Sequence, residues 1–316
     1  MKILVTGGAG FIGSSLIEEL LKKGDKVTCV DNFSDYYDIL FKKENIRRLK
    51  NKRLRVLNVD IEDRARLMRL LKGLHFDKVV HLAARVGVRN SLKNPDLYIK
   101  TNVTGTLNVL EAAREMGVKD VVFAGSSSVY GNDEPIPSKE DAPCLKPLNP
   151  YAMSKRSAEL LCYTYHMIYG LNVTILRFFT VYGPKGRPDM SPYIFTQSLL
   201  TGKKINLNGD GRATRDFTNI KDIVRGITLA LAKPFGYEII NLGASRPVSI
   251  KKFISVLEKI TGKKAKIKYL PSLSGESRNT YADTSKAKKL LGFESKITLE
   301  AGLTEFVDWF KANRLG

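Results

Sequence analysis

Short apolar runs rich in β-branched residues alternate with longer segments of helical periodicity through the first 176 residues of the chain. The expected strands are residues 2–6, 26–31, 54–60, 78–84, 120–126 and 172–178. The expected helices are residues 11–23, 42–50, 63–71, 97–116 and 151–169. Continuous apolar strands separated by helices are typical of a parallel sheet that is covered on both faces. The pattern therefore predicts an α/β fold with a doubly wound parallel sheet.

After residue 177 this alternation gives way to shorter elements. The segments between them are rich in glycine and proline, as in "GPKGRPDMSP", "NGDGRATRDF" and "LPSLSGES". We expect residues 1–176 to form one domain, and residues 177–316 to form mainly a smaller, interleaved lobe from which some segments return to the first domain. Such a lobe would close over the carboxyl edge of the sheet, where α/β folds bind their ligands.

The composition, 43% hydrophobic and 27% charged over 316 residues, is that of an ordinary globular protein. The net charge of +20 is compatible with a nucleic acid, an anionic membrane surface or an anionic substrate. Much of this charge lies in residues 42–55, 263–268 and 286–289. These clusters lack the interleaved aromatic residues of a base-stacking surface, so solvated surface is favoured over nucleic-acid binding.

Two other classes of protein are disfavoured by the sequence. The first apolar stretch, residues 3–5, is interrupted by glycines and resembles neither a signal peptide nor a membrane span, so we expect a cytoplasmic protein without membrane contact. Cys29, Cys144 and Cys162 form no CxxC pair, and together with the three histidines they show no metal-ligand spacing. Neither disulfides nor a metal site are expected.

The segment "TGGAGFIG" places Gly7, Gly10 and Gly13 between a predicted strand and a predicted helix. In this position glycines allow a tight turn, close approach of a pyrophosphate and close packing of the helix on the sheet. Asp31 ends the second strand, where a carboxylate binds a ribose diol and repels a 2′-phosphate. The third strand ends with Asp60 and Ile61, which are placed to bracket an adenine. These features predict a Rossmann-like domain that binds NAD rather than NADP.

A second motif, "YAMSK", sets Tyr151 and Lys155 four residues apart, on one face of a helix. A lysine ammonium near the phenol, together with a cationic nicotinamide, would lower the pKa of Tyr151 and let it act as a base. The segment "AGSSSVYG" adds three hydroxyls, Ser126 to Ser128, at a strand end. It contains no carboxylate.

In this order, the motifs resemble those of the extended short-chain dehydrogenase/reductases, within their nucleotide-sugar epimerase group. The resemblance runs from Met1 to the final helical segment. It is carried by the glycine trio, Asp31, "HLAA" at residues 81–84, the serine cluster, the Tyr151/Lys155 pair and "RDF" at residues 215–217.

The resemblance implies epimerisation at C4 of a sugar nucleotide, with NAD retained and regenerated in each cycle. Tyr151 would remove the C4 hydroxyl proton while hydride passes to NAD, Ser126 would share the proton relay, and Lys155 would hold the nicotinamide ribose. The cofactor-binding residues expected are Gly7, Gly10, Phe11, Ile12, Gly13, Asp31, Asn32, Asp60, Ile61, Leu82, Ala83, Ala84, Arg85, Tyr151 and Lys155.

The missing carboxylate after Ser126 bears on the reaction type. Relatives that dehydrate the sugar are expected to carry Asp and Glu at the two positions after the relay hydroxyl, and decarboxylases typically carry Glu at the second. Ser127 and Ser128 cannot do this acid–base work at neutral pH, although they can hydrogen-bond a substrate carboxylate. The serines therefore favour epimerisation.

The segment "LRFFTVYGPKGRPDM", residues 176–190, carries the substrate prediction. It resembles the UDP-glucuronate 4-epimerases, whereas UDP-galactose epimerases usually have Asn in place of Thr180. We assign Ser127, Ser128 and Thr180 to the uronate carboxylate. Arg187 is assigned to the nucleotide-sugar side and Arg215 to the diphosphate, because guanidinium geometry suits phosphate oxygens. Glu276 aligns with an acidic residue that often contacts the nucleotide ribose.

Some of these positions have alternative interpretations. Arg215 could instead form a structural ion pair with Asp216. Arg85 stands where the subgroup commonly has Gln, and either touches an NAD phosphate or lies on the surface. Lys185 stands where an aromatic residue is common.

The leading hypothesis is an NAD-dependent isomerase that interconverts UDP-glucuronate and UDP-galacturonate. The alternatives are the same reaction on UDP-glucose or an N-acetylhexosamine, a UDP-glucuronate decarboxylase, or a non-catalytic nucleic-acid-binding relative. The family also implies a homodimer in which the helices at residues 97–116 and 151–169 pair with their symmetry mates.

Overall fold

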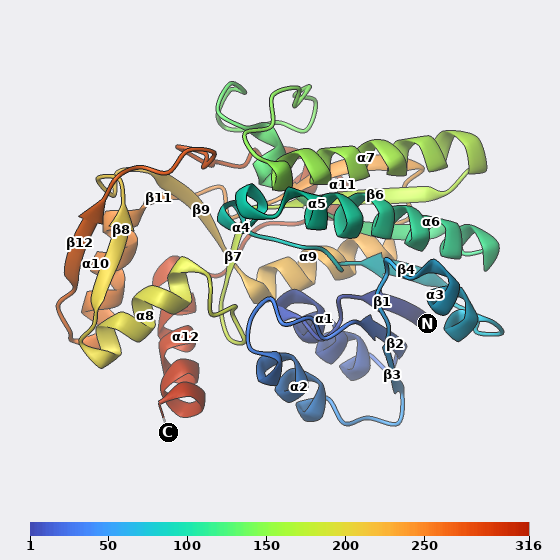
Figure 1. The fold of residues 1–316 in the computed structure, drawn as a ribbon, viewed down its shortest axis with the longest axis horizontal. Helices are drawn as coiled ribbons and strands as arrows, with labels where there is room; N and C mark the ends of the chain where they lie inside the picture. The colour runs from blue at the N-terminus through green and yellow to red at the C-terminus, as the bar shows by residue number, and fades with distance from the viewer. Residues whose placement is uncertain (316) are drawn as a thin grey trace.

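The computed structural model describes residues 1–315, and its largest element is a seven-stranded parallel sheet (Figure 1). In sheet order the strands are β10 (Tyr237–Leu242), β6 (Asn172–Phe178), β5 (Asp120–Ser126), β4 (Lys78–His81), β1 (Lys2–Thr6), β2 (Lys26–Asp31) and β3 (Leu54–Asn58). The strand order reverses direction between β1 and β4. The predicted doubly wound parallel sheet is therefore confirmed, and its carboxyl edge beside β1 is where such folds bind ligands.

Helices cover both faces of this sheet (Figure 1). One face packs on α1 (Phe11–Lys22), α9 (Ile220–Ala232) and α11 (Ser285–Leu291). The other packs on α3 (Arg64–Leu71), α6 (Gly105–Glu115) and α7 (Pro150–Tyr169). A further helix, α2 (Ile39–Arg48), lies beside α1. Burial on both faces explains why the central strands are continuous apolar runs.

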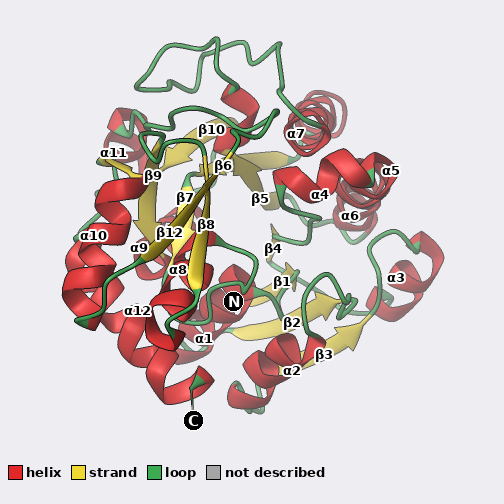
Figure 2. Ribbon diagram, turned by 60° about the vertical axis from the view of Figure 1, so that its left-hand side comes forward, coloured by secondary structure: helices red, strands yellow, loops and turns green. Residues whose placement is uncertain are grey.

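A smaller lobe lies beyond the carboxyl edge of the sheet (Figure 2). Its strands are β7 (Thr180–Tyr182), β9 (Thr214–Asn219) and β11 (Pro247–Ser249) in one sheet, and β8 (Lys204–Asn208) and β12 (Lys266–Leu270) in another. Its helices are α8 (Ser191–Thr201), α10 (Ile250–Thr261) and α12 (Leu299–Arg314). Stacked rings of Phe217 and Phe253, with centroids 4.3 Å apart, mark its separate aromatic core.

The chain passes more than once between the large sheet and the lobe. Both α9 and β10 belong to the large sheet and its covering layer, although they follow β7, β8 and β9 of the lobe in sequence. A domain boundary between residues 176 and 177 stays a prediction.

The expected helix at residues 97–116 is confirmed as one helical segment, in which α5 (Pro95–Tyr98) continues through a π-helix (Ile99–Thr104) into α6. A short helix that was not expected, α4 (Val88–Lys93), precedes it. In the π-helix the Asn102 side chain holds the backbone of Arg85, with Arg85 N donating to Oδ1 at 2.7 Å and Nδ2 donating to Arg85 O at 2.9 Å. Such bulges in a helix frequently mark functional sites.

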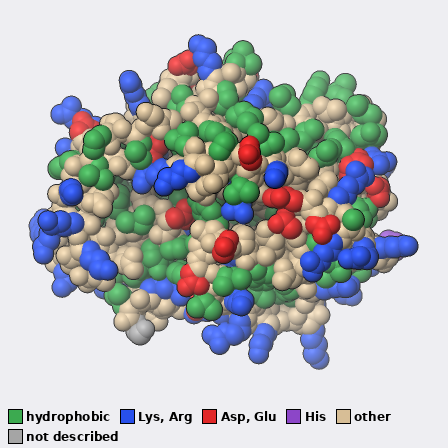
Figure 3. Space-filling model, viewed as in Figure 1, with side chains coloured by type: hydrophobic (Ala, Val, Ile, Leu, Met, Phe, Trp, Pro, Cys, Tyr) green, Lys and Arg blue, Asp and Glu red, His purple; other side chains and the backbone are tan. Residues whose placement is uncertain are grey.

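Surface charge is dispersed on the face shown in Figure 3, where Lys and Arg side chains lie among acidic and apolar ones. Across residues 1–315, no helix combines the length and the apolar character that crossing a bilayer requires.

Candidate active site

The glycine turn joins β1 to α1. Gly7 has a φ of +69°, and a Cβ there would lie 2.6 Å from the backbone N of Ala83. A Cβ on Gly13 would overlap the carbonyl oxygen of Gly7. Gly10 is the N-cap of α1 and brings no side chain, so the first N–H groups of the helix are accessible to an anion. This cradle fits the pyrophosphate of a dinucleotide.

At the end of β2, Asp31 lies against this turn. Its Oδ2 accepts a hydrogen bond from Ala9 N at 3.1 Å, and its Oδ1 is 3.2 Å from the ammonium of Lys42. Nearby, Asn32 donates to the Asp60 carboxylate at 2.7 Å. Assigning Lys42 to a solvated basic cluster was therefore wrong, because only 10% of its side chain is exposed. This contact could not be predicted from the sequence, because Asp31 and Lys42 lie on different elements, β2 and α2.

Most of the other expected cofactor residues line the carboxyl ends of β1, β3 and β4. Leu82 N donates to Thr6 O at 3.1 Å, and Ala83 N donates to Thr6 Oγ1 at 3.3 Å. Ala84 and Arg85 continue this segment and are half-buried, as is Ile12. Phe11 and Ile61, by contrast, are buried in the apolar core.

The two catalytic candidates of "YAMSK" lie in the first turns of α7, which Asn149 caps by accepting a hydrogen bond from Ala152 N at 2.8 Å. Burial raises the pKa of Tyr151, while the Ser126 hydroxyl and the Arg187 charge act to lower it. The net direction is opposite to the predicted lowering, and the cation that acts on the phenol is Arg187. That prediction also included the positive charge of the nicotinamide.

Lys155 is buried one turn further along α7, with its ammonium 4.5 Å from the ring centroid of Phe123 on β5. Burial lowers the pKa of Lys155 to about 8, and the charge of Glu159 opposes this shift. His81 on β4 is hydrogen-bonded to Thr6 Oγ1 at 2.6 Å and to Thr106 Oγ1 at 3.0 Å. Burial, with the Lys155 charge, lowers the pKa of His81 to about 3, so His81 is neutral at pH 7.

The three serines form a turn at the carboxyl end of β5. Ser126 ends the strand, and its Oγ accepts a hydrogen bond from Ser128 N at 3.2 Å. Ser126 pairs with Phe178 on β6, so Ser128 and Thr180 each lie two residues beyond a paired position, at the same edge of the sheet. The residues Ser127, Ser128 and Thr180 are half-buried. The structure thus places these hydroxyls at one edge of the sheet, and the Ser126 hydroxyl is near enough to Tyr151 to act on its phenol.

Two further substrate candidates lie on segments of the lobe. The Nε of Arg187 donates to Asp189 Oδ1 at 2.9 Å. Arg215 on β9 donates to Thr214 O at 2.8 Å and lies 4.0 Å from the Glu276 carboxylate, which also pairs with Arg89 Nε at 3.1 Å. Glu276 and Arg215 are thus close together.

The alternative that Arg215 forms an ion pair with Asp216 is wrong. The buried Asp216 carboxylate instead accepts hydrogen bonds from the backbone N–H groups of Ala244, Ser245 and Ala282 at 2.8, 3.0 and 3.0 Å. The carboxylate thus ties two loop segments to β9 and makes no ion pair with Arg215.

Lys185 has a clear structural contact. Its ammonium lies 2.7 Å from the Glu18 carboxylate on α1 and therefore ties the loop after β7 to the nucleotide-binding domain. In the part of the chain that the structure describes, no three His, Cys, Asp or Glu side chains come together as metal ligands, and the three cysteines are buried and unpaired.

Comparison with known proteins identifies the family. The family model described as "NAD dependent epimerase/dehydratase family" matches residues 3–243. The chain is 48% identical to a UDP-glucuronate 4-epimerase of Thermodesulfobacterium geofontis, over 98% of this chain and 96% of that protein.

Two solved structures have the same fold over nearly the whole chain. A UDP-glucuronic acid 4-epimerase from Bacillus cereus, in complex with UDP-glucuronic acid and NAD, is 40% identical with a TM-score of 0.93, over 99% of both chains. A UDP-glucose 4-epimerase from Thermotoga maritima, with UDP-glucose, is 34% identical with a TM-score of 0.91, also over 99% of both chains. This chain therefore belongs to the NAD-dependent epimerase/dehydratase family, as its motifs predicted.

Proposed function

We propose that the protein interconverts UDP-glucuronate and UDP-galacturonate by NAD-dependent epimerisation at C4 of the sugar. The observation that carries this proposal is the turn after β5, which sets hydroxyls and no carboxylate beside Tyr151. The similarity to UDP-glucuronate 4-epimerases over the full chain supports it.

NAD would be held by the glycine turn, Asp31 and the segment after β4. The glycine positions leave room that a side chain would fill, and Asp31 at the strand end suits a ribose diol. When bound, NAD supplies a hydride acceptor for C4 and returns the hydride to the same carbon. The protein's own side chains would transfer the proton and bind the substrate.

Tyr151 is the proposed base. It takes the proton of the C4 hydroxyl and returns it after the 4-keto sugar has presented its other face. Ser126 is close enough to influence the phenol and shares the proton. Lys155 lies on the same face of α7, one turn further along, and would hold the nicotinamide ribose.

The uronate carboxylate would be bound by Ser127, Ser128 and Thr180. Each hydroxyl can donate a hydrogen bond to a carboxylate oxygen without adding a charge that would repel it. A glutamate at position 128 would repel a carboxylate and could serve the proton transfers of decarboxylation. The serine at this position therefore favours retention of the carboxylate.

Arg187 is proposed to bind on the nucleotide-sugar side, and Arg215 is proposed to bind the diphosphate. Burial lowers the pKa of Arg215, while the Glu276 charge opposes the shift. A guanidinium that has already lost most of its water has less desolvation to complete when a diphosphate binds. Glu276 is proposed to contact the nucleotide ribose once Arg89 and Arg215 engage other groups.

We further propose a cytoplasmic homodimer that forms through α6 and α7. A stripe of apolar side chains on α7 is exposed, and it includes Leu160 at 52% and Met167 at 63%. These two residues are seven positions apart and therefore lie on the same face of the helix. Contiguous exposed apolar surface is typical of an interface. The three buried, unpaired cysteines agree with a compartment that keeps thiols reduced.

The test is to incubate the purified protein with UDP-glucuronate and, separately, with UDP-glucose, and to resolve the products by NMR. We expect UDP-galacturonate from the first and little change in the second. Turnover of UDP-glucose alone would retain the epimerase reaction and remove the carboxylate site. Release of CO₂ from UDP-glucuronate would indicate a decarboxylase.

A further inference from the structure

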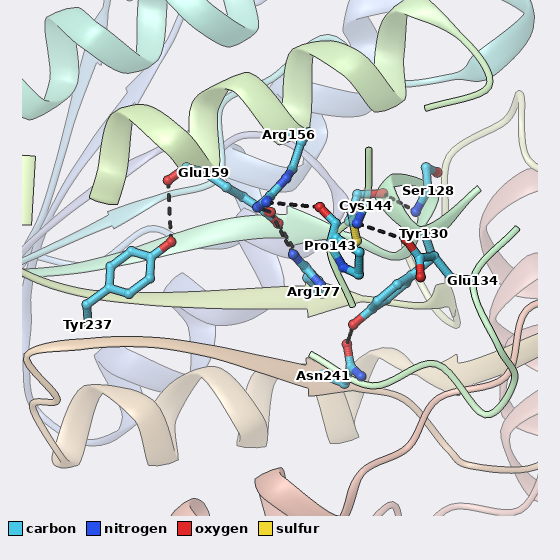
Figure 4. Close-up of polar contacts among 11 residues, drawn as sticks. Ser128, Tyr130, Glu134, Pro143, Cys144, Arg156, Glu159, Arg177, Tyr237 and Asn241 are labelled. Atoms are coloured by element: carbon cyan, nitrogen blue, oxygen red, sulfur yellow. Dashed lines mark hydrogen bonds and ion pairs between the residues drawn. The ribbon is translucent and has the colours of Figure 1, made fainter. Parts of the chain in front are cut away.

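A fully buried ion pair joins Glu159 on α7 to Arg177 on β6 (Figure 4). The Nε and Nη2 of Arg177 donate to the two carboxylate oxygens of Glu159 at 3.0 and 2.9 Å, and both side chains are 0% exposed. Buried ion pairs are a poor source of stability, because desolvation of both charges offsets their attraction. Stability alone therefore does not explain why Glu159 and Arg177 are paired in the core.

The pair connects α7, the helix that carries Lys155, to β6, the strand next to the one that ends at Ser126. Glu159 follows Lys155 by four residues and shares its face of α7. Arg177 lies on β6, directly opposite Gly125, the residue before Ser126. A Cβ on Gly125 would lie 3.1 Å from Cγ of Arg177, so the arginine side chain passes over Gly125.

The same guanidinium also contacts the far end of the serine turn. Its Cζ lies 4.8 Å from the ring centroid of Tyr130, the last residue of that turn. The Tyr130 hydroxyl donates to Asn241 Oδ1 on β10 at 2.7 Å (Figure 4). Nη1 of Arg177 is buried and has no hydrogen-bond partner among the residues that the structure describes. The cation–π contact of the guanidinium with the Tyr130 ring therefore adds to its two hydrogen bonds with Glu159.

Arg156 extends the contact to the loop that precedes α7. Its Nη1 is 3.1 Å from Glu159 Oε2, and its Nη2 donates to Pro143 O at 3.2 Å. The carboxylate of Glu159 therefore receives two guanidinium groups from two elements.

We propose that Glu159 and Arg177 are positioning residues of the epimerase reaction, which hold Lys155 on α7 and the hydroxyls of the Ser126–Ser128 turn in the relative placement that the proton relay needs. This proposal rests on the proposed function. Neither residue is required to touch the substrate or the cofactor. Their effect on catalysis passes through Lys155 and the turn.

The pair also affects the charge of Lys155. The groups that face this ammonium are Glu159 and Cys162 on α7, His81 on β4 and the Phe123 ring on β5, with Arg177 behind Glu159. Because the Glu159 charge opposes the burial that lowers the pKa of Lys155, removing that charge lowers this pKa further. The alkaline loss of activity would then begin at a lower pH.

The experiment compares three variants of the NAD-loaded enzyme with the wild type. Glu159→Gln removes the charge at nearly constant shape, and Arg177→Lys keeps both charges but loses the forked donor. Glu111→Gln is the matched control: Glu111 is also a buried carboxylate bound by an arginine and by a residue of α7, Tyr165, but it lies away from the serine turn. Bound NAD, melting temperature, kcat, KM and the pH profile of kcat are measured.

For Glu159→Gln we expect kcat to fall about tenfold or more, KM to change by less than about twofold, and the alkaline midpoint to move down by about one pH unit. Arg177→Lys should lower kcat and leave that midpoint in place. Glu111→Gln should melt earlier and keep the wild-type kcat and midpoint.

Two results would overturn the proposal. One is a folded, NAD-loaded Glu159→Gln enzyme with wild-type kcat and midpoint. The other is a loss of kcat in Glu111→Gln as large as that in Glu159→Gln, which would show that general destabilisation explains the loss. If Glu159→Gln does not fold, Arg177→Lys decides, since wild-type kcat in that variant also rejects the proposal. The assays use whichever nucleotide sugar the wild type turns over, so a wrong uronate assignment appears in the wild type alone.

Discussion

The ammonium of Lys42 lies 3.2 Å from the Asp31 carboxylate, and both side chains are nearly buried at the end of β2. Asp31 also accepts a hydrogen bond from Ala9 N in the glycine turn. Lys42 therefore supports the carboxylate that we propose as the ribose ligand of NAD.

Lys42→Met should lower stability by roughly 3 kcal/mol, because it leaves a buried carboxylate without its cation. It should also lower the amount of NAD that copurifies. The double variant Lys42→Met/Asp31→Asn should regain stability but not NAD. Thermal melts and the NAD released on denaturation measure both effects, and Lys43→Met, an exposed neighbour on α2, is the control. Full NAD content in the double variant would remove Asp31 from the cofactor site.

His81 gives a prediction of stability against pH. Its pKa in the fold is lowered to about 3, below its ordinary value of 6.5, by burial and by the Lys155 charge. The unfolded chain therefore binds more protons, so stability is complete above about pH 6.5 and is lost as the pH falls toward 3, by at most about 1.4 kcal/mol per pH unit.

Melts at pH 7, 6, 5 and 4 should show a shallower pH dependence for His81→Asn than for the wild type. His75→Asn, which changes a histidine outside the core, should leave the dependence unchanged. Identical slopes for the wild type and His81→Asn would mean that the imidazole is not buried as a neutral group.

Tyr151→Phe should lower kcat by about 10²- to 10⁴-fold, because it removes the group that takes the C4 proton. The ring remains, so packing against Tyr98, whose ring centroid is 6.2 Å away, and bound NAD should be retained. Product formation is followed by NMR and bound NAD by absorbance. Wild-type turnover in this variant would exclude Tyr151 as the base.

Thr180→Val removes one proposed hydroxyl donor to the uronate at constant shape. A hydrogen bond to a charged group contributes about 1.5–3 kcal/mol, so KM for UDP-glucuronate should rise by about tenfold or more. Thr196→Val on α8 is the control, since its hydroxyl is buried without a hydrogen-bond partner in the described residues. An unchanged KM in Thr180→Val would place the carboxylate elsewhere.

Leu160→Glu combined with Met167→Glu should convert the proposed dimer to a monomer, because two charges would be buried in an apolar interface. Analytical ultracentrifugation measures the mass. Leu145→Glu, which changes a side chain that is 78% exposed on a loop, should leave the mass unchanged. A wild-type protein that sediments as a monomer would reject the interface.

The sequence predicted the parts of the site that lie close together along the chain. The glycine turn, the Tyr151/Lys155 pair and the three serines are each set by local spacing, and the doubly wound parallel sheet follows from the alternation of elements. The structure places these groups at one edge of the sheet.

Contacts between distant segments could not be predicted in this way. Asn102 holds Arg85 from inside a π-helix, Lys42 crosses from α2 to β2, and Arg177 crosses from β6 to α7. Each joins residues on different elements, and the sequence around one residue gives no indication of its partner. The four-residue spacing of Lys155 and Glu159 was visible, but the burial that gives it meaning was not.

The most direct test of the proposed reaction uses UDP-glucuronate that carries deuterium at C4. Hydride that leaves C4 and returns to C4 must bring the deuterium with it, so we predict UDP-galacturonate with deuterium retained at C4 and no CO₂ released. Loss of the deuterium to solvent, appearance of a decarboxylated sugar, or absence of any galacturonate product would contradict this account.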